Sequence, residues 1–413
     1  MKIAPGTPLR VQFDFGRMRT TSVGRLALDR QAAVFEYDRA FIGSGIVLNA
    51  LDLPRAGLVH PRDPRAGLHG VFADSLPDSW GQELVRRRAA KAGIDYRGLT
   101  VLDQLAAVGS RGPGALTYQP EIGIDDVDEA IDLDALAVES LEILSGAARD
   151  VTPLLRALGG SSGGARPKVL VAMNDRHQMI AGLHELQPGY HPWIVKFRTA
   201  IDLVDIGPLE AAYADMARAA GLEVAPTVLI AGKNGGYFAT RRFDRTEDGG
   251  RLHMMSAAGA LDIDFATPAI DYLQLLSLTR AITNNAGHVM RVARRMIFNV
   301  LAINRDDHAK QHAYLMDATG HWSLAPSYDL TFASGPGGEH YLAVAGLGKD
   351  ITRDAIHAVA KSHYLPRKDI EAMIDEVSTA IGDFRRFASV YGVSADTVRL
   401  VEARLTEQHR LFL

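Results

Sequence analysis

The chain has 413 residues, of which 47% are hydrophobic and 23% are charged; at roughly 150 residues per domain this is enough for two or three domains with a real core, which excludes a disordered chain. Its 45 Lys and Arg residues and 49 Asp and Glu residues give a formal net charge of −4, which argues against a protein that coats nucleic acid or an anionic membrane by itself. The sequence contains no cysteine, so disulfides, zinc–thiolate centres and a cysteine nucleophile are excluded. Because the N-terminus lacks the apolar core of a signal peptide and no apolar run reaches the roughly 18 residues of a membrane span, we expect a cytoplasmic protein without membrane contact.

The first hundred residues are typical of a β-rich unit. Residues 23–37 alternate apolar and polar side chains around an Asp-Arg pair, which predicts a β-hairpin. Residues 53–68 contain too much Pro and Gly for regular structure, and residues 79–92 predict a short helix. Acidic residues cluster over 121–134 before a helix expected at about 134–148, so this linker is the best domain boundary.

From about residue 150 the pattern changes to a glycine-rich loop, then strands around one helix, then helices. The predicted strands are 168–173, 192–198, 227–232 and 237–243, with an amphipathic helix at 208–220. The predicted helices beyond residue 255 are 270–283, 287–303, 368–384 and 395–411. A hairpin followed by a loop is expected over 312–331.

This order predicts an α+β protein of three units. We expect a β-rich N-terminal subdomain at 1–120, a lobe with the glycine-rich loop at 121–250 and a helical lobe at 251–413. Bilobal protein kinases have the same order from the second unit onwards, although the order alone fits many folds. The expected architecture is therefore a bilobal protein-kinase-like fold with an additional β-rich N-terminal subdomain and a helical C-terminal lobe.

Two acidic motifs follow one another in the third unit, NRDDHAKQ at 304–311 and APSYDL at 325–330. Phosphoryl transfer needs a carboxylate beside the attacking hydroxyl and oxygen ligands that hold magnesium against the phosphates. Protein kinases place the base Asp five residues before a metal-binding Asn, with a second metal-binding Asp after a hairpin. Here Gln311 stands five residues after Asp306, and Asp329 follows the predicted hairpin. The alternative is that these aspartates cap turns and helices.

Lys196 lies in the predicted strand PWIVKFR, whose other uncharged residues are apolar or aromatic. Burying a lysine costs free energy unless an anion pairs with it. ATP phosphates would be such an anion, with Glu210 on the following helix holding the lysine. The alternative is a lysine on the solvated face of an edge strand.

The glycine-rich run GGSSGGARPK covers residues 159–168. Glycines let backbone amides approach phosphate oxygens closely, and Arg166 and Lys168 add positive charge. The GxxxxGK[ST] spacing of a Walker loop is absent, and Lys168 precedes a strand rather than a helix. A flexible surface loop is the alternative interpretation.

As a set, these motifs resemble the HipA-like kinases of bacterial toxin–antitoxin modules. The stretches that carry the resemblance are VGRLALDRQAAVFEY (23–37), FADSLPDSWG (72–81), SSGGARPKVLV (161–171), WIVKF (193–197), RRFDR (241–245), DDHAK (306–310) and LAPSYDL (324–330). The resemblance implies a serine/threonine kinase that uses ATP and Mg²⁺ to phosphorylate a protein target, which in some members is an aminoacyl-tRNA synthetase. It also implies a HipB-like helix-turn-helix antitoxin that neutralises the kinase and carries most contacts to operator DNA.

The resemblance also implies roles for individual residues. Asp306 is expected to be the catalytic base, with Lys310 in the same motif, and Asp329 and Gln311 the metal ligands. The expected nucleotide-binding residues are Gly160, Ser161, Ser162, Gly163, Gly164, Lys168, Lys196, Glu210, Arg241, Phe243 and His308. Within this set, residues 239–243 correspond to the hinge that holds adenine. Ser161 aligns with the autophosphorylated serine of the family, and Ser162 is a near alternative.

One position departs from the family, whose motif D-x-H-x-K-N ends in Asn where this chain has Gln311. One extra methylene displaces the amide oxygen, and Mg²⁺ demands near-ideal octahedral geometry. A catalytically weakened kinase fold that acts as a co-repressor or binding module is therefore the main alternative. A metallohydrolase built on His308 and His312, four residues apart, is disfavoured because no HExxH arrangement is present.

Overall fold

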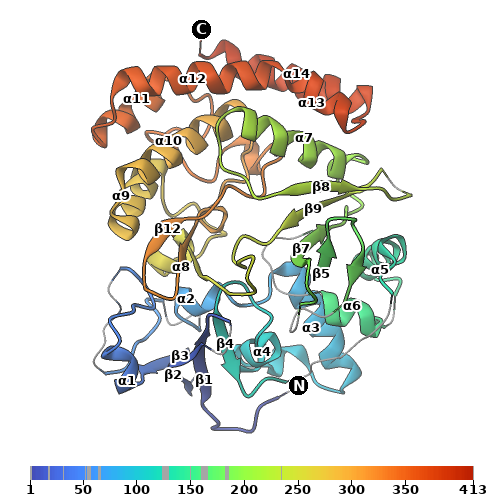
Figure 1. Cartoon of the computed structure of the whole chain (residues 1–413), viewed down its shortest axis with the longest axis vertical. Coiled ribbons are helices and arrows are strands. Elements are labelled where there is room, and N and C mark those ends of the chain that lie inside the picture. Colours follow the sequence, from blue (N-terminus) through green and yellow to red (C-terminus); the bar gives the residue numbers. More distant parts are fainter. Residues whose placement is uncertain are drawn as a thin grey trace.

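The computed structural model describes residues 2–16, 19–30, 32–51, 53, 57–63, 67–122, 130–148, 150–159, 166–181, 186–233 and 235–412. Three sheets and the helices around them form an elongated α+β molecule (Figure 1). The N-terminal sheet lies at one end, a five-stranded sheet in the middle and the C-terminal helices at the other end. The predicted α+β class is confirmed. No helix in the part of the chain that is described is both long and apolar enough to cross a bilayer.

The N-terminal unit is a four-stranded antiparallel sheet with helices around it. Its strands are β1 (Leu9–Asp14), β2 (Thr20–Asp29), β3 (Ala32–Tyr37) and β4 (Leu116–Gln119), in the order β3-β2-β1-β4. Its helices are α1 (Arg39–Ile42), α2 (Gly70–Ala73), α3 (Ser79–Lys91), the 3₁₀ turn η2 (Tyr96–Gly98) and α4 (Val101–Val108). The predicted hairpin over 23–37 is confirmed, since β2 pairs with β3 and places Leu26 opposite Phe35.

The middle unit is a five-stranded antiparallel sheet in the order β6-β5-β7-β9-β8. The strands are β5 (Lys168–Asn174), β6 (Met179–Ile180), β7 (Tyr190–Lys196), β8 (Thr227–Ile230) and β9 (Tyr237–Arg241), and the helices are α5 (Leu133–Ser145), α6 (Pro153–Leu158) and α7 (Ile206–Ala219). Side chains of α3, α5 and α6 share one apolar core with this sheet, to which α3 contributes Trp80 and Leu84. Strand β7 is central, so the edge-strand interpretation of Lys196 is wrong.

The C-terminal unit combines a three-stranded sheet with helices. The sheet consists of β10 (His253–Ser256), β11 (Ala313–Met316) and β12 (Trp322–Leu324). The helical elements are α8 (Ala257–Leu261), α9 (Tyr272–Thr283), α10 (Ala286–Leu301), η3 (Ala309–Gln311), η4 (Pro336–Gly338), α11 (Arg353–Ser362), α12 (Arg367–Gly382), α13 (Phe384–Val390) and α14 (Ala395–Arg410). The predicted helices correspond to α9, α10, α12 and α14, whereas the shorter α11 and α13 were not expected.

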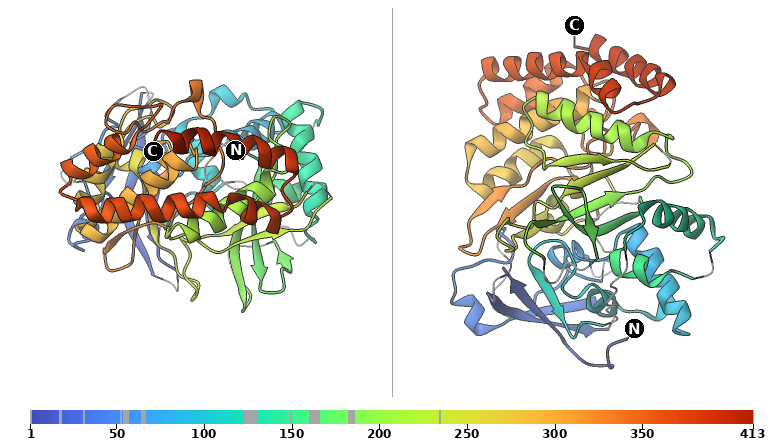
Figure 2. Two further views of the ribbon diagram at one scale, coloured as in Figure 1. Left: turned by 90° about the horizontal axis from the view of Figure 1, so that it is seen from above. Right: turned by 45° about the vertical axis from the view of Figure 1, so that its right-hand side comes forward.

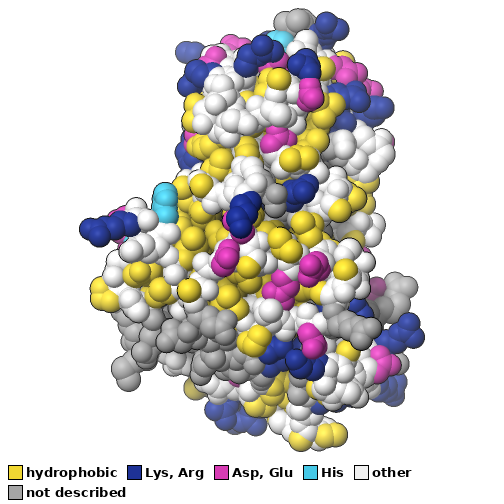
Figure 3. Space-filling model, turned by 90° about the vertical axis from the view of Figure 1, so that its right-hand side faces the viewer, with side chains coloured by type: hydrophobic (Ala, Val, Ile, Leu, Met, Phe, Trp, Pro, Cys, Tyr) yellow, Lys and Arg dark blue, Asp and Glu magenta, His cyan; other side chains and the backbone are white. Residues whose placement is uncertain are grey.

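The outer helices close the top of the molecule. Figure 2 shows α12 and α14 lying across this end. In the space-filling view, Lys, Arg, Asp and Glu side chains are dense over these helices, and apolar atoms are more frequent around the middle (Figure 3). Beneath the outer helices, the second half of α10 is buried through residues such as Met296, Phe298 and Leu301. These buried side chains belong to one apolar core that the helical lobe shares with the N-terminal sheet, which contributes residues such as Val11 and Phe13.

Two short helices, α2 and α8, join the N-terminal unit to the C-terminal unit. They cross at glycine, because a Cβ atom on Gly70 would lie 2.8 Å from the carbonyl oxygen of Gly259 and 2.9 Å from Cα of Asp262. The carboxylate of Asp262 accepts a hydrogen bond from Gly70 N at 2.6 Å. In return, Asp74 accepts hydrogen bonds of 2.7 Å from both the backbone N–H and the hydroxyl of Ser256. Each helix thus ends in a carboxylate that satisfies the first amides of the other.

We expect Gly70→Ala to lower the free energy of unfolding by about 1–3 kcal/mol, because the added methyl group would press on backbone atoms of α8. Chemical denaturation measures the change. Gly382→Ala is the matched control, since no heavy atom lies within 4 Å of its Cβ position at the end of α12; it should leave stability unchanged or raise it by up to about 1 kcal/mol. Equal stabilities of the two variants would show that α2 and α8 do not pack closely.

Candidate active site

A cleft of about 800 Å³ opens between the middle sheet and the C-terminal unit. Its lining comes from β5, β7 and β9 on one side and from the loop after β12 on the other. The lining residues include Lys168, Ile194, Lys196, Thr240, Arg241, Phe243, Tyr328, Asp329 and Leu330. A cleft with apolar walls and a few converging charges is typical of a small-molecule site.

Lys196 stands at the end of β7 and links two carboxylates from distant parts of the chain. Its ammonium contacts Glu210 on α7 and Asp329 after β12. The Lys196 side chain is 12% exposed and that of Glu210 is 3% exposed. Burial alone would lower the pKa of Lys196, but the two carboxylates outweigh it and raise that pKa. The lysine is therefore held as a cation at the floor of the cleft.

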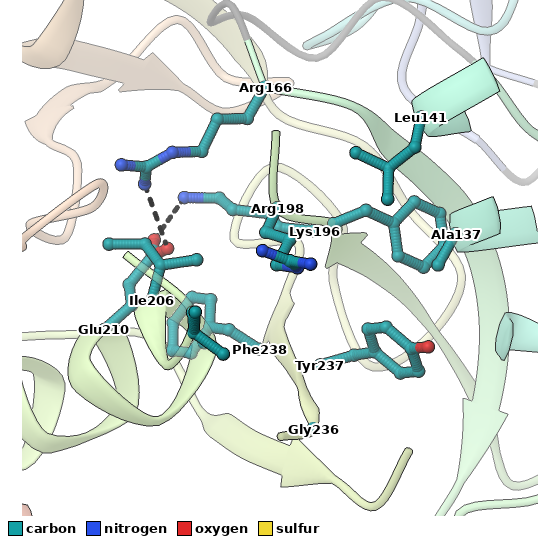
Figure 4. Close-up of a pocket in the computed structure, with 13 residues that line it drawn as sticks. Ala137, Leu141, Arg166, Lys196, Arg198, Ile206, Glu210, Gly236, Tyr237 and Phe238 are labelled. Carbon is teal, nitrogen blue, oxygen red and sulfur yellow. Dashed lines mark hydrogen bonds and ion pairs between the residues drawn. The ribbon is translucent and has the colours of Figure 1, made fainter. Parts of the chain in front are cut away.

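Arg166 joins the same group of charges from the strand side. Its Nε lies 3.1 Å from Oδ1 of Asp202, and its NH1 lies 3.7 Å from Oε2 of Glu210. Figure 4 shows Arg166 and Lys196 converging on Glu210. Glu210 thus holds two cations beside each other: Lys196, which lines the cleft, and Arg166, which lines the pocket next to it.

Asp329 has a left-handed backbone, with φ at 53°, a conformation that Asp tolerates better than most residues. Burial would raise the pKa of its carboxyl, but the charges of Lys196 and Lys168 outweigh burial and hold that pKa well below its usual range. The Gln311 side-chain amide donates a 3.1 Å hydrogen bond to Asp329 Oδ2. The two predicted metal ligands therefore lie together, although the amide nitrogen of Gln311 faces Asp329.

Asp306 is the accessible carboxylate of the site, with 54% of its side chain exposed. Partial burial and the negative charge of Asp329 raise the pKa of Asp306 to about 6. Oδ1 of Asp306 lies 3.9 Å from Nε2 of His308, and burial lowers the pKa of this histidine. Such a carboxylate is ionised at neutral pH yet basic enough to accept a proton.

The remaining residues of the DDHAK motif pack against an aromatic side chain from outside it. The rings of His308 and Phe265 have centroids 5.1 Å apart, and Nζ of Lys310 lies 4.6 Å from the Phe265 centroid. The backbone carbonyl of Lys310 accepts a 2.5 Å hydrogen bond from the hydroxyl of Tyr328. Residues Ala309–Gln311 form the 3₁₀ turn η3, with His308 directly before it and His312 directly after it.

The residues predicted as a hinge line the opposite wall of the cleft. Arg241 extends β9, and its guanidinium lies 2.6 Å from Nδ1 of His191. The ring of Phe243 packs on Tyr328 with centroids 5.3 Å apart. The segment predicted as the hinge, which ends at Phe243, therefore contacts the motif that contains Asp329.

The predicted glycine-rich loop is only partly described. Six of its residues lie outside the described part of the chain: Gly160, Ser161, Ser162, Gly163, Gly164 and Ala165. Its last residue, Lys168, begins β5 and lines the cleft. Of this loop, Lys168 lies at the site as the sequence predicts, whereas the prediction for Ser161 and Ser162 concerns residues outside the described part of the chain.

A buried polar network beneath Asp306 was missed by the sequence reasoning. Asp307 is fully buried, and its carboxylate accepts hydrogen bonds from the Tyr272 hydroxyl at 2.7 Å and from the backbone N–H of Tyr341 at 2.9 Å, with His340 Nδ1 also at 2.9 Å. Asn299 donates to the same hydroxyl at 2.8 Å and accepts from Asn304 at 3.0 Å. The chain of contacts fixes the backbone that presents Asp306. In the sequence, the only indication of this network is that a second aspartate, Asp307, directly follows Asp306.

Carboxylates and amides near the cleft could hold one cation together with a ligand's phosphates. In the described ranges, no three His, Asp or Glu side chains form a ready cage for a metal ion. Asp329 and Gln311 nevertheless adjoin each other in the cleft. Mg²⁺ usually binds through one or two protein oxygens plus substrate phosphates and waters, so this donor set fits magnesium better than it fits a structural metal.

Comparisons with known proteins agree with this geometry. Residues 160–383 match the family model of the HipA-like C-terminal domain, and residues 17–119 match that of the HipA N-terminal domain. No curated protein matches the chain. Among solved structures, a chain of the Shewanella oneidensis MR-1 toxin–antitoxin complex of HipA, HipB and operator DNA is similar, with TM-score 0.68 and 17% identity over 96% of this chain and 95% of that one. The Helicobacter pylori proinflammatory kinase CtkA aligns at TM-score 0.33 and 12% identity over 52% of this chain and 91% of that one. The first of these likenesses confirms a HipA-type fold.

We expect Asp307→Ala to lower the free energy of unfolding by about 3–5 kcal/mol, because several buried donors would lose one acceptor together. The neighbouring Asp306→Ala removes a half-exposed carboxylate whose charged form the fold disfavours, so at neutral pH it should leave stability unchanged or raise it. Thermal and denaturant unfolding of the two variants measure the difference. Similar losses for both would contradict the assignment of Asp307 as the anchor.

Proposed function

The chain belongs to the HipA-like family, and from this premise we propose that it is an ATP-dependent serine/threonine kinase toxin that a HipB-like helix-turn-helix antitoxin neutralises. The observation that carries the proposal is the ammonium of Lys196 joined to both Glu210 and Asp329 in a cleft beside Asp306. Active kinases need a lysine held by a helical glutamate together with a metal-binding aspartate.

Asp306 acts as the base in this proposal. It accepts the proton of the substrate hydroxyl while the hydroxyl oxygen forms a bond to the γ-phosphorus of ATP and the bond from that phosphorus to the β-phosphate oxygen breaks. The raised pKa of Asp306, about 6, suits this role because a base is most effective when its pKa approaches the working pH. Lys310 and His308 belong to the same loop and help to shape it.

The phosphates are held by charge. Lys196 and Lys168 supply ammonium groups, and Glu210 keeps Lys196 in place. Arg241 and Phe243 line the wall of the cleft where the adenine ring of ATP would lie. Asp329 and Gln311 would hold Mg²⁺, which neutralises the charge that develops on the transferred phosphoryl group. These residues promote phosphoryl transfer by positioning the reactants and stabilising charge, as is usual for kinases.

Three further parts of the proposal come from family membership. Autophosphorylation is proposed at Ser161 in the glycine-rich loop, since about −1.5 to −2 added charge beside a phosphate site would oppose ATP binding. The substrate is proposed to be a protein, with an aminoacyl-tRNA synthetase as one candidate, and operator DNA is reached mainly through the antitoxin. The similar Shewanella oneidensis complex contains HipB and operator DNA.

We also propose that the chain is divided into three units, at residues 1–120, 121–250 and 251–413.

A second function is favoured by one observation. Gln311 directs its amide nitrogen to Asp329, and it stands where the family motif has Asn. If this arrangement persists with nucleotide bound, the second metal ligand is displaced and catalysis is weak. The chain would then serve as a co-repressor or binding module that binds ATP without efficient turnover.

We expect Asp306→Asn to lower phosphoryl transfer by about 10²–10⁴-fold, because the amide cannot accept the hydroxyl proton. Calorimetry with Mg·ATP should show unchanged nucleotide binding, since Lys196 and Asp329 remain. Phosphoproteomics after brief induction, with this variant as the control, would identify the target. Mg·ATP binding without turnover by the unmodified protein would support the co-repressor alternative instead.

The pH dependence of kcat/KM should show an acidic limb near pH 6. Asp306 must be ionised to act as a base, and its raised pKa means that protonation removes activity about tenfold per pH unit below that point. An ordinary aspartate would keep activity down to about pH 4. Mg·ATP affinity measured over the same range separates titration of Asp306 from titration of the nucleotide. A flat profile between pH 5 and pH 7 would contradict the role of this carboxylate.

A further inference from the structure

An aspartate from the N-terminal unit reaches the cleft. Asp78 precedes α3, and its Oδ2 lies 3.0 Å from Nζ of Lys168, the first residue of β5. The side chains are 6% and 3% exposed, so the pair is buried. The two residues are 90 positions apart in the chain. A buried lysine that faces a phosphate site is thus paired with a residue that the five-stranded sheet does not supply.

The loop before α3 holds Lys168 at two points. One carboxylate oxygen of Asp78 accepts a 2.7 Å hydrogen bond from Gly81 N and caps α3, which leaves the other oxygen for the lysine. The indole N–H of Trp80 donates to the backbone carbonyl of Lys168 at 3.1 Å, and Trp80 is 1% exposed. Both ends of Lys168 are therefore tied to one short segment of the N-terminal unit.

The position of Lys168 relates it to the other charges of the cleft. It lies directly opposite Lys196 in the pairing of β5 with β7, so both side chains project from the same face of the sheet. The charges of Lys196 and Lys168 both hold down the pKa of Asp329. The 3.0 Å contact with Asp78 gives the Lys168 ammonium a carboxylate other than Glu210 and Asp329, the two that Lys196 contacts.

We propose that Asp78 is a positioning residue for nucleotide phosphates, which it serves by holding the Lys168 ammonium at the mouth of β5 and away from Asp329. The inference rests on the proposed kinase function and deepens it, because it makes the N-terminal unit part of the nucleotide site. Asp78 acts through Lys168 and does not touch the nucleotide. The long, flexible stem of lysine explains why such a partner is needed.

The test compares Asp78→Asn with the unmodified full-length protein. Asn is as good an N-cap as Asp, so α3 should keep its cap while Lys168 loses its contact with the Asp78 carboxylate. Calorimetry with Mg·ATP should give a Kd about tenfold higher, whereas the Kd for adenosine, which has no phosphate, should change less than twofold. A general loss of structure would weaken both ligands alike, so the contrast reports on the phosphates.

Glu83→Gln is the matched control, since it removes a carboxylate from the same helix that pairs with Arg86 and Arg87 instead of the cleft; it should leave both Kd values unchanged. A double-mutant cycle with Lys168→Met completes the test. In that background Asp78→Asn should have no further effect on Mg·ATP binding. This comparison remains available if the single variant does not fold, because the double variant has no ammonium at position 168 for Asp78 to hold.

The outcomes separate the two levels of the proposal. If the unmodified protein binds neither Mg·ATP nor adenosine, the kinase proposal fails and the role of Asp78 fails with it. If the unmodified protein binds both but Asp78→Asn binds Mg·ATP as tightly or more tightly, only the role of Asp78 is overturned. A further tenfold loss in the Lys168→Met background would also overturn it, because Asp78 would then act by another route.

Discussion

A lysine buried on a central strand is the constraint on which the rest of the structure depends. A charged ammonium cannot be removed from water without an anionic partner, and Lys196 on β7 has two, Glu210 and Asp329. One partner requires that α7 dock beside the sheet, where its Ala211 and Ala214 pack with Phe238 of β9. The other requires that the loop after β12 reach across from the C-terminal unit. Satisfying one charge therefore sets the arrangement of both lobes and leaves a cleft between them.

A second layer of polar contacts holds the walls of this cleft. Asp307 anchors the loop that carries Asp306, through Tyr272 and the backbone at Tyr341. The crossing of α2 and α8 fixes the N-terminal unit against the same lobe, with Asp74 hydrogen-bonded to Ser256. These carboxylates are buried and their partners come from distant segments. The surroundings of the exposed Asp306 can consequently shift its pKa, while the stability of the fold depends on other carboxylates.

Sequence periodicity was sufficient for the elements that bury a regular apolar pattern. The hairpin of β2 and β3 and the long helices α9, α10, α12 and α14 were predicted for this reason. The short helices α11 and α13 were missed because fewer turns give a weaker periodic signal. The 3₁₀ turn over Ala309–Gln311 was also missed, since its geometry is imposed by contacts of His308 and Lys310 with Phe265, which lies more than forty positions earlier in the chain.

The sequence by itself determined the order of the motifs, the resemblance to HipA-like kinases, and the presence of lysine, carboxylate and amide groups at kinase spacing. Local patterns carry this information because each motif is a short run of neighbouring residues. Only the tertiary structure decided that Lys196 is central rather than at an edge, that Asp307 is an anchor while Asp306 is accessible, and that Asp78 partners Lys168. Each of these depends on burial and on charges that meet across 34 to 133 positions of chain, and no local pattern records which distant carboxylate a buried lysine will find.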